Sequence, residues 1–225
     1  YFSGQIKDIS DEEFTRLYGR EIPDGSWSGE IRMNDAVCQL YYGKGIFGKL
    51  FYGVLRILLK ISGEALAGDK HFGLDFDVIG NVCNVVKQCV DMGVQVGIVI
   101  GGGNFWRGRT SDAIDRPKAD QIGMLATVMN CIYVSEIFRS EGMMTQILTP
   151  FECGSMTKLF SKDRANKYFS KGMVVFFAGG TGHPYFSTDT GVALRAIEMD
   201  ADCILLAKAI DGVYDGSYYA ALIIP

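Results

Sequence analysis

The sequence is poor in histidine, proline and tryptophan, with two, five and two of these residues among 225. Zinc sites need closely spaced cysteine and histidine ligands, whereas the six cysteines here stand far apart, with no Cys-x-x-Cys pair. We therefore expect no metal site built from protein ligands. Scattered cysteines also predict reduced thiols, and hence a cytoplasmic protein, rather than a disulfide framework.

An excess of positive charge is also missing, since 22 lysines and arginines stand against 26 aspartates and glutamates. Proteins that bind DNA or RNA present a basic face to the phosphates, so we expect no nucleic-acid partner. We also find no apolar run long enough to cross a membrane. The nearest candidate, residues 46–61, contains Lys49, Arg56 and Lys60, and we expect no membrane association.

From Val54 onwards, apolar stretches with strand spacing alternate with stretches of helical spacing. Strands are expected at 54–60, 94–100, 145–148, 173–177 and 203–207, and helices at 75–92, 120–138, 163–170 and 190–199. Strands that alternate with helices form a parallel sheet with helices on both faces. The predicted fold class is therefore α/β, a three-layer α/β/α sandwich around a mainly parallel, Rossmann-like sheet.

Residues 1–53 differ from the rest because they lack this regular alternation and show no recognisable chemistry. Within them, residues 41–52 mix glycine, aromatic residues and lysine in a way that suits a short amphipathic helix. We interpret residues 1–53 as an N-terminal appendage whose role the sequence does not define.

The most informative features are two glycine-rich segments that directly follow apolar, strand-like runs. Gly101-Gly102-Gly103-Asn104 follows residues 98–100, and Gly179-Gly180-Thr181-Gly182 follows residues 174–177. Glycine lets the backbone turn so that consecutive N–H groups converge on an anion, and a following helix adds its positive end. Ligands of parallel sheets bind at the carboxyl ends of strands, where both segments fall. The two loops predict two phosphorylated ligands that face each other, as in phosphoryl transfer.

Two cations are candidates for binding the phosphates. Lys60 ends a predicted strand ahead of Ser62-Gly63, where its ammonium group can bridge two phosphates and neutralise transition-state charge. The alternative is a surface lysine on an edge strand, and the neighbouring glycine loops favour the catalytic role. Arg107 follows the first loop and offers a planar guanidinium group that suits phosphate oxygens.

The second glycine loop continues into residues 181–189, which combine hydroxyl groups, aromatic rings and a carboxylate. Such a loop suits a nucleoside, with rings against the base and hydroxyl groups on sugar or phosphate. Alternatively, one of residues 187–189 only caps the helix that starts near Thr190, and both roles are compatible. Asp120 begins the long apolar helix, and its position favours helix capping over a ligand contact.

Five segments together resemble the bacterial uridylate (UMP) kinases, a branch of the amino acid kinase family. They are Lys60–Leu66, Gly101–Gly108, Asp120–Asn130, Gly180–Asp189 and Asp211–Tyr214, in the order that the family has them. We therefore expect an amino acid kinase-like, nucleotide-binding domain at 54–215 and a non-matching tail at 216–225. Residues 1–53 resemble, more weakly, the C-terminal tail of family-three β-glucosidases.

The resemblance implies transfer of the γ-phosphoryl group of ATP to UMP, giving UDP and ADP in pyrimidine nucleotide biosynthesis. It also implies Mg²⁺ held mainly by the nucleotide phosphates, a homo-oligomer (a hexamer in the family), and GTP and UTP as effectors. The apolar helix at 120–138 fits either a subunit contact or the core of one subunit.

Site residues follow from the resemblance by position. ATP contacts are expected from Lys60, Ile61, Ser62, Gly63, Gly103, Arg107 and Tyr214. UMP contacts are expected from Gly102, Asp120, Thr181, Gly182, His183, Pro184, Tyr185, Phe186, Ser187 and Thr188. The catalytic residues are expected to be Lys60, Asp189, which orients Lys60, and Arg107.

Other interpretations remain open at this stage. The family continues well beyond the segment that matches Asp211–Tyr214, so we expect a C-terminally truncated fold. A truncated or fused, non-catalytic remnant that binds UMP but not ATP is therefore the alternative. Smaller acceptors such as carbamate or an acyl-amino acid offer no base for the aromatic loop, and a glycosidase would need paired carboxylates that residues 1–53 lack.

Overall fold

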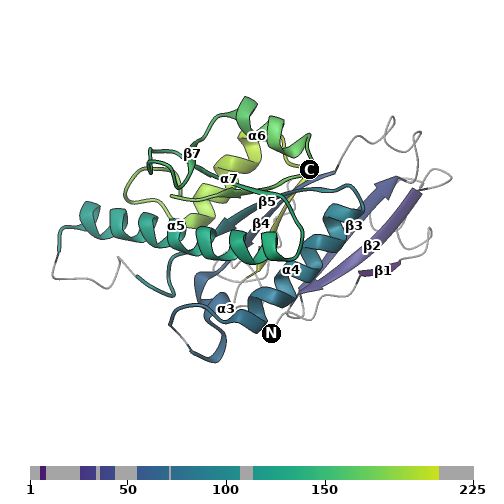
Figure 1. Cartoon of the computed structure of the whole chain (residues 1–225), viewed down its shortest axis with the longest axis horizontal. Coiled ribbons are helices and arrows are strands. Elements are labelled where there is room, and N and C mark those ends of the chain that lie inside the picture. Colours follow the sequence, from purple (N-terminus) through teal and green to yellow (C-terminus); the bar gives the residue numbers. More distant parts are fainter. Residues whose placement is uncertain are drawn as a thin grey trace, which may run out of the picture.

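The computed structural model describes residues 55–70, 72–106 and 114–207, together with the backbone of residues 6–8, 26–33 and 36–43. A six-stranded sheet has the order β7-β6-β8-β5-β4-β9, and every neighbouring pair is parallel (Figure 1). Its strands are β4 (Arg56–Ile61), β5 (Gln95–Ile100), β6 (Thr145–Thr149), β7 (Lys158–Leu159), β8 (Val174–Phe177) and β9 (Cys203–Ala207). The helices are α3 (Gly63–Ala67), α4 (Phe76–Asp91), α5 (Arg116–Ser140), α6 (Lys162–Phe169) and α7 (Thr188–Glu198), with a 3-10 turn at Gly68–Lys70.

Helices cover both faces of the sheet because successive side chains of a strand point to opposite sides. Leu59 and Ile98 belong to a core with α4 and α5 on one face. Leu58 and Val99 belong to a second core with α6 and α7 on the other face (Figure 1). The predicted three-layer α/β/α sandwich with a parallel sheet is confirmed.

The strands and helices predicted beyond residue 53 are all present, with ends shifted by a few residues. The largest shift is at α5, which begins at Arg116 and has Pro117 in its first turn, where the missing N–H of proline costs nothing. The structure adds α3 and β7, which are five and two residues long. Elements this short show no period in a sequence.

Helix α5 corrects the expectation that no segment is long and apolar enough to cross a membrane. By length and composition alone, α5 is long and apolar enough to do so, although the core helices of other proteins can be as long and apolar. In the fold, Cys131, Val134 and Phe138 of α5 are buried against the sheet, whereas Leu125 and Met129 are more than half exposed. One face of α5 is therefore part of the core, and the opposite face is an exposed apolar surface.

Residues 1–53 contribute a separate antiparallel sheet of β1 (Ile6–Asp8), β2 (Ser26–Met33) and β3 (Ala36–Gly43), paired in the order β1-β2-β3. The short helix predicted at 41–52 is wrong for residues 41–43, which end β3. The tail at 216–225 lies outside the described residues, and the domain division stays a prediction.

Candidate functional site

Three loops lie next to one another at the carboxyl ends of the neighbouring strands β4, β5 and β8. β5 lies between β4 and β8, so the segments that follow these strands are neighbours. They are Ser62-Gly63 after β4, the first glycine loop (Gly101–Asn104) after β5 and the second glycine loop (Gly179–Gly182) after β8. The predicted position of both glycine loops at the carboxyl ends of parallel strands is confirmed.

The first glycine loop uses glycine for close approach. The backbone turns here, with the amides of Phe105 and Trp106 donating to the carbonyl of Gly102 at 3.0 Å, but none of the three glycines has a positive φ. A Cβ at Gly102 would lie 2.8 Å from the carbonyl oxygen of Gly123 and 3.0 Å from Ala126 Cβ. The amides of Gly102 and Gly103 meet no acceptor within the described residues. The loop thus packs tightly against α5.

The second glycine loop uses glycine for its conformation. Gly179, Gly180 and Gly182 have φ of +80°, +59° and +82°, a region that side chains disfavour. A Cβ at Gly180 would meet nothing within 4 Å, whereas a Cβ at Gly179 would lie 2.8 Å from the Phe151 ring and one at Gly182 would lie 3.0 Å from Pro150. Tyr185, a few residues on, also has a positive φ of 73°. Here the predicted turn-forming role of glycine holds.

Lys60 and Asp189 form an ion pair between the two loops, with Nζ 2.9 Å from Oδ1. Lys60 is 6% exposed on β4, which lies between β5 and β9, so the alternative of a surface lysine on an edge strand is wrong. Asp189 stands in the first turn of α7, where the helix dipole favours a negative charge. The side chain of Ser187 accepts from the amide of Thr190 at 3.2 Å and caps this helix, as predicted. The two residues predicted to act together are thus in contact.

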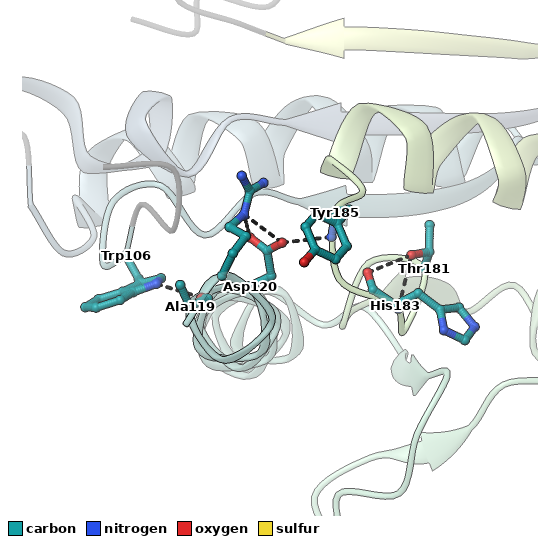
Figure 2. Close-up of polar contacts among 7 residues, drawn as sticks. Trp106, Ala119, Asp120, Thr181, His183 and Tyr185 are labelled. Carbon is teal, nitrogen blue, oxygen red and sulfur yellow. Dashed lines mark hydrogen bonds and ion pairs between the residues drawn. The ribbon is translucent and has the colours of Figure 1, made fainter. Parts of the chain in front are cut away.

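Asp120 links α5 to the loop that follows β8 (Figure 2). Nε of Arg116 lies 2.9 Å from both carboxylate oxygens of Asp120, and the amide of Tyr185 donates to Oδ2 at 2.8 Å. The Arg116 guanidinium carbon is 5.6 Å from the centre of the Tyr185 ring. The predicted capping role is wrong, because α5 begins at Arg116 and Asp120 lies in its second turn.

The other predicted UMP-binding residues lie on the same side of the molecule. Thr181 Oγ1 donates to the carbonyl of His183 at 3.3 Å and accepts from its amide at 3.2 Å, which closes a local turn (Figure 2). Tyr185 and Phe186 expose 66% and 58% of their surface. Among the predicted ATP-binding residues, Ile61 is wholly buried, so only its backbone can meet a ligand. Arg107 and Tyr214 lie outside the described residues.

A cavity of about 570 Å³ opens beside the second loop. It is lined by Pro150, Leu159, Phe160, Thr181, His183, Phe186, Thr190, Leu194, Arg195 and Glu198. Arg195 pairs with Glu198 and stacks on the ring of Phe160. Neither Lys60 nor the first glycine loop lines this cavity, so it does not mark the phosphate-facing centre.

Sequence reasoning missed a buried amide pair beneath the first loop. Asn104 and Asn130 are 1% and 0% exposed and hydrogen-bond to each other. Asn130 stands in an otherwise apolar stretch of α5, and a polar residue on the sheet-facing side of a helix is the signal that could have revealed the pair.

Buried cysteines are not candidates for catalysis. Burial raises the pKa of the Cys131 thiol to about 12 and that of Cys89 to about 12 as well. Thiolates are the reactive form, so both side chains stay inert at neutral pH.

Comparison with known proteins agrees with this arrangement. A model of the amino acid kinase family matches residues 55–218. A UMP kinase from Bacillus anthracis superposes with a TM-score of 0.67 at 35% identity, over 72% of this chain and 68% of that chain. A UMP kinase from Ureaplasma parvum superposes with a TM-score of 0.68 at 34% identity, over 74% of each chain. The chain therefore belongs to the amino acid kinase family.

Proposed function

We propose that this protein is a UMP kinase, which transfers the γ-phosphoryl group of ATP to UMP and releases UDP and ADP. The observation that best supports the proposal is the ion pair of buried Lys60 with Asp189 between two glycine loops. Similarity to two UMP kinases at 34–35% identity supports UMP as the acceptor.

Lys60 supplies the positive charge of this reaction. Phosphoryl transfer needs positioning and charge neutralisation more than a strong base. Because Lys60 is buried, its charge is less screened by water than a surface lysine's. Asp189 holds the ammonium group in place between the loops, and the amides of Gly102 and Gly103 donate to phosphate oxygens.

The acceptor nucleotide binds at the second loop. Residues 181–188 bring hydroxyl groups and the exposed rings of Tyr185 and Phe186, which offer surface to a pyrimidine base. Asp120, already fixed by Arg116, accepts from the ribose hydroxyl groups.

The donor nucleotide binds across the ends of β4 and β5, at Lys60, the backbone of residues 61–63 and Gly103. By resemblance, Arg107 and Tyr214 complete this half. No group of three His, Cys, Asp or Glu side chains suited to a metal ion occurs within the described residues. Mg²⁺, which prefers oxygen ligands and often uses substrate phosphates, is then held mainly by the nucleotides and neutralises their charge.

The exposed face of α5 is proposed as the contact with a second copy of the chain. Ile122, Leu125, Met129 and Tyr133 recur at helical spacing and are 40–53% exposed. Leu125→Glu should reduce the sedimentation coefficient of the protein, whereas Ile197→Glu, at an exposed position of α7, should not. A wild type that sediments as a monomer would contradict this contact.

Three further properties follow from the resemblance and stay proposals. They are a hexameric assembly, regulation by GTP and UTP, and a cytoplasmic location. Adding GTP or UTP to the kinase assay at fixed UMP and ATP tests the regulation directly.

The experiment that tests the function is UDP formation from UMP and Mg·ATP by the purified protein. Lys60→Ala should reduce kcat by at least about 100-fold, because it removes the charge between the phosphates. Lys162→Ala is the matched control, since Lys162 also pairs with an aspartate, Asp200, but lies on α6 and is half exposed. Equal rates for Lys60→Ala and the wild type would overturn the assignment of the site.

A further inference from the structure

Two buried polar side chains of α5 contact the two glycine loops, and the proposed reaction gives neither of them a role. Thr127 and Asn130 are 3% and 0% exposed. Oγ1 of Thr127 accepts from the amide of Gly179 at 2.8 Å, and Nδ2 of Asn130 donates to the carbonyl of Gly101 at 2.7 Å. One helix therefore holds the first residue of each loop.

The contact of Asn130 is part of a closed network. Asn104 Nδ2 donates to Asn130 Oδ1 at 3.0 Å, and Asn130 Nδ2 donates to Asn104 Oδ1 at 2.8 Å. Asn104 Nδ2 also donates to the carbonyl of Gly73 at 2.6 Å. A Cβ at Gly63 would lie 2.4 Å from Asn104 Oδ1, so the loop after β4 packs on the same amide. The amide pair thus fixes the first loop against both α5 and Gly63.

The contact of Thr127 has one defined direction. Its hydroxyl group donates to the carbonyl of Met124 at 2.7 Å, one turn earlier in α5. A hydroxyl group has a single hydrogen, so its oxygen faces the amide of Gly179 as an acceptor. This bond fixes the position of Gly179, and so of the second loop, along the axis of α5.

We propose that Thr127 and Asn130 are positioning residues that set the separation of the two glycine loops, and therefore of the two phosphate groups. The inference rests on the proposed function. Residues three apart on a helix lie one above the other at a fixed distance of about 5–6 Å between Cβ atoms. The helix thus acts as a rigid spacer, which matters because a misplacement of about 1 Å costs roughly 100-fold in rate.

For the second loop, Thr127→Val removes the hydroxyl group at nearly constant volume, whereas Thr127→Ser retains it. We expect Thr127→Val to raise the KM for UMP about tenfold, the effect of losing one buried hydrogen bond, and to leave the KM for ATP unchanged. Thr127→Ser should keep both values near those of the wild type.

For the first loop, Asn130→Asp replaces the donating nitrogen by an oxygen that faces the oxygens of Gly101 and Asn104. We expect kcat to fall about 100-fold and both KM values to rise, because this loop meets both nucleotides. Ser135→Ala is the matched control, since Ser135 is also buried on α5 but bonds to Thr145 of β6. It should lower the unfolding temperature without changing either KM.

Trp106 gives a readout that does not depend on activity. It lies two residues beyond Asn104, and its indole N–H donates to the carbonyl of Ala119 at 2.8 Å (Figure 2). In a Trp27→Phe background it is the only tryptophan. Asn130→Asp should shift its emission, and Thr127→Val should not.

The outcomes separate the inference from the proposed function. If the wild type forms no UDP, the function is wrong, and the emission of Trp106 still tests whether Asn130 holds the first loop. If the wild type is active and Thr127→Val keeps its KM for UMP, the inference is wrong. If Asn130→Asp does not fold, Thr127→Val and Thr127→Ser decide the matter between them.

Discussion

The two glycine loops look alike in the sequence, but they differ in backbone conformation and in how closely their glycines are packed. The first contains glycine because Gly63, Gly123 and Ala126 come so close that a side chain would collide with them. In the second loop all three glycines have positive φ, and this is the only constraint at Gly180, whereas a Cβ at Gly179 or Gly182 would also come within 3.0 Å of Phe151 or Pro150. A run of glycines after a strand therefore indicates a loop that can approach a ligand, but it does not tell whether packing or conformation requires the glycine.

The largest effect is expected from Gly102→Ala in the first loop. Its Cβ would lie 2.8 Å from the carbonyl of Gly123, so the loop must move away from α5. We expect kcat/KM to fall by about 100-fold or more. Overpacking of this kind should also cost about 1–3 kcal/mol of stability, measured by urea unfolding.

Gly80→Ala in α4 is the control for this substitution. A Cβ there meets nothing within 4 Å, and the position is helical. Alanine should increase the stability by about 1 kcal/mol through helix propensity and leave the kinetics unchanged. Wild-type kinetics in Gly102→Ala would show that the close packing of the first loop is not required.

Gly180→Ala in the second loop should have a smaller effect. With no clash, only the left-handed backbone at φ +59° opposes alanine, at a cost of about 1–2 kcal/mol. Gly180→Asn should lose less stability than Gly180→Ala, because asparagine tolerates this conformation. Gly172→Ala, at φ +68° with open space in the turn before β8, should lose similar stability but no activity. If Gly180→Ala and Gly172→Ala change the kinetics equally, the second loop has no special role.

Asp120→Asn tests how the second loop is held from α5. The change keeps the shape but removes the charge that pairs with Arg116 and accepts from the amide of Tyr185. Charge-assisted hydrogen bonds are roughly twice as strong as neutral ones, so the KM for UMP should rise about tenfold, with the KM for ATP unchanged. Asp115→Asn, at an exposed position that makes no capping hydrogen bond, should leave both values unchanged.

The smallest effect concerns Cys131, which lies on α5 behind the first loop. Burial raises the pKa of its thiol from 9.0 to about 12, so the folded protein keeps a proton that the unfolded chain loses above pH 9. The free energy of unfolding should therefore fall as the pH rises from 9 towards 12. Cys131→Ala should make this fall less steep, as measured by urea unfolding at pH 8 and pH 10. If the free energy of unfolding of the variant falls equally steeply, the raised pKa of Cys131 is not the cause.

Much of the fold follows from the sequence because a regular parallel sheet leaves a strong periodic signal. The strands that end at Ile61, Ile100 and Phe177 were each predicted to within a residue at that end, which placed the three loops correctly. The contact between Lys60 and Asp189 was anticipated only through the resemblance to a known family, since the two residues lie far apart in the chain.

The details of the site could not be read from the sequence. Asp120 was assigned to helix capping because the apolar period begins there, although Pro117 allows the helix to begin a turn earlier. The position of Asn130 in an apolar stretch of α5 indicates a buried polar contact, but its partner Asn104 is brought there by tertiary packing and could not be identified from the local pattern.

The most direct test of the account is calorimetric titration of the purified protein with UMP and with Mg·ATP separately, followed by a UDP assay of the mixture. The account predicts that both nucleotides bind and that UDP forms at a rate that Lys60→Ala reduces by at least about 100-fold. Binding of UMP without binding of Mg·ATP, and no UDP, would contradict it and identify a protein that binds the acceptor without transferring a phosphoryl group.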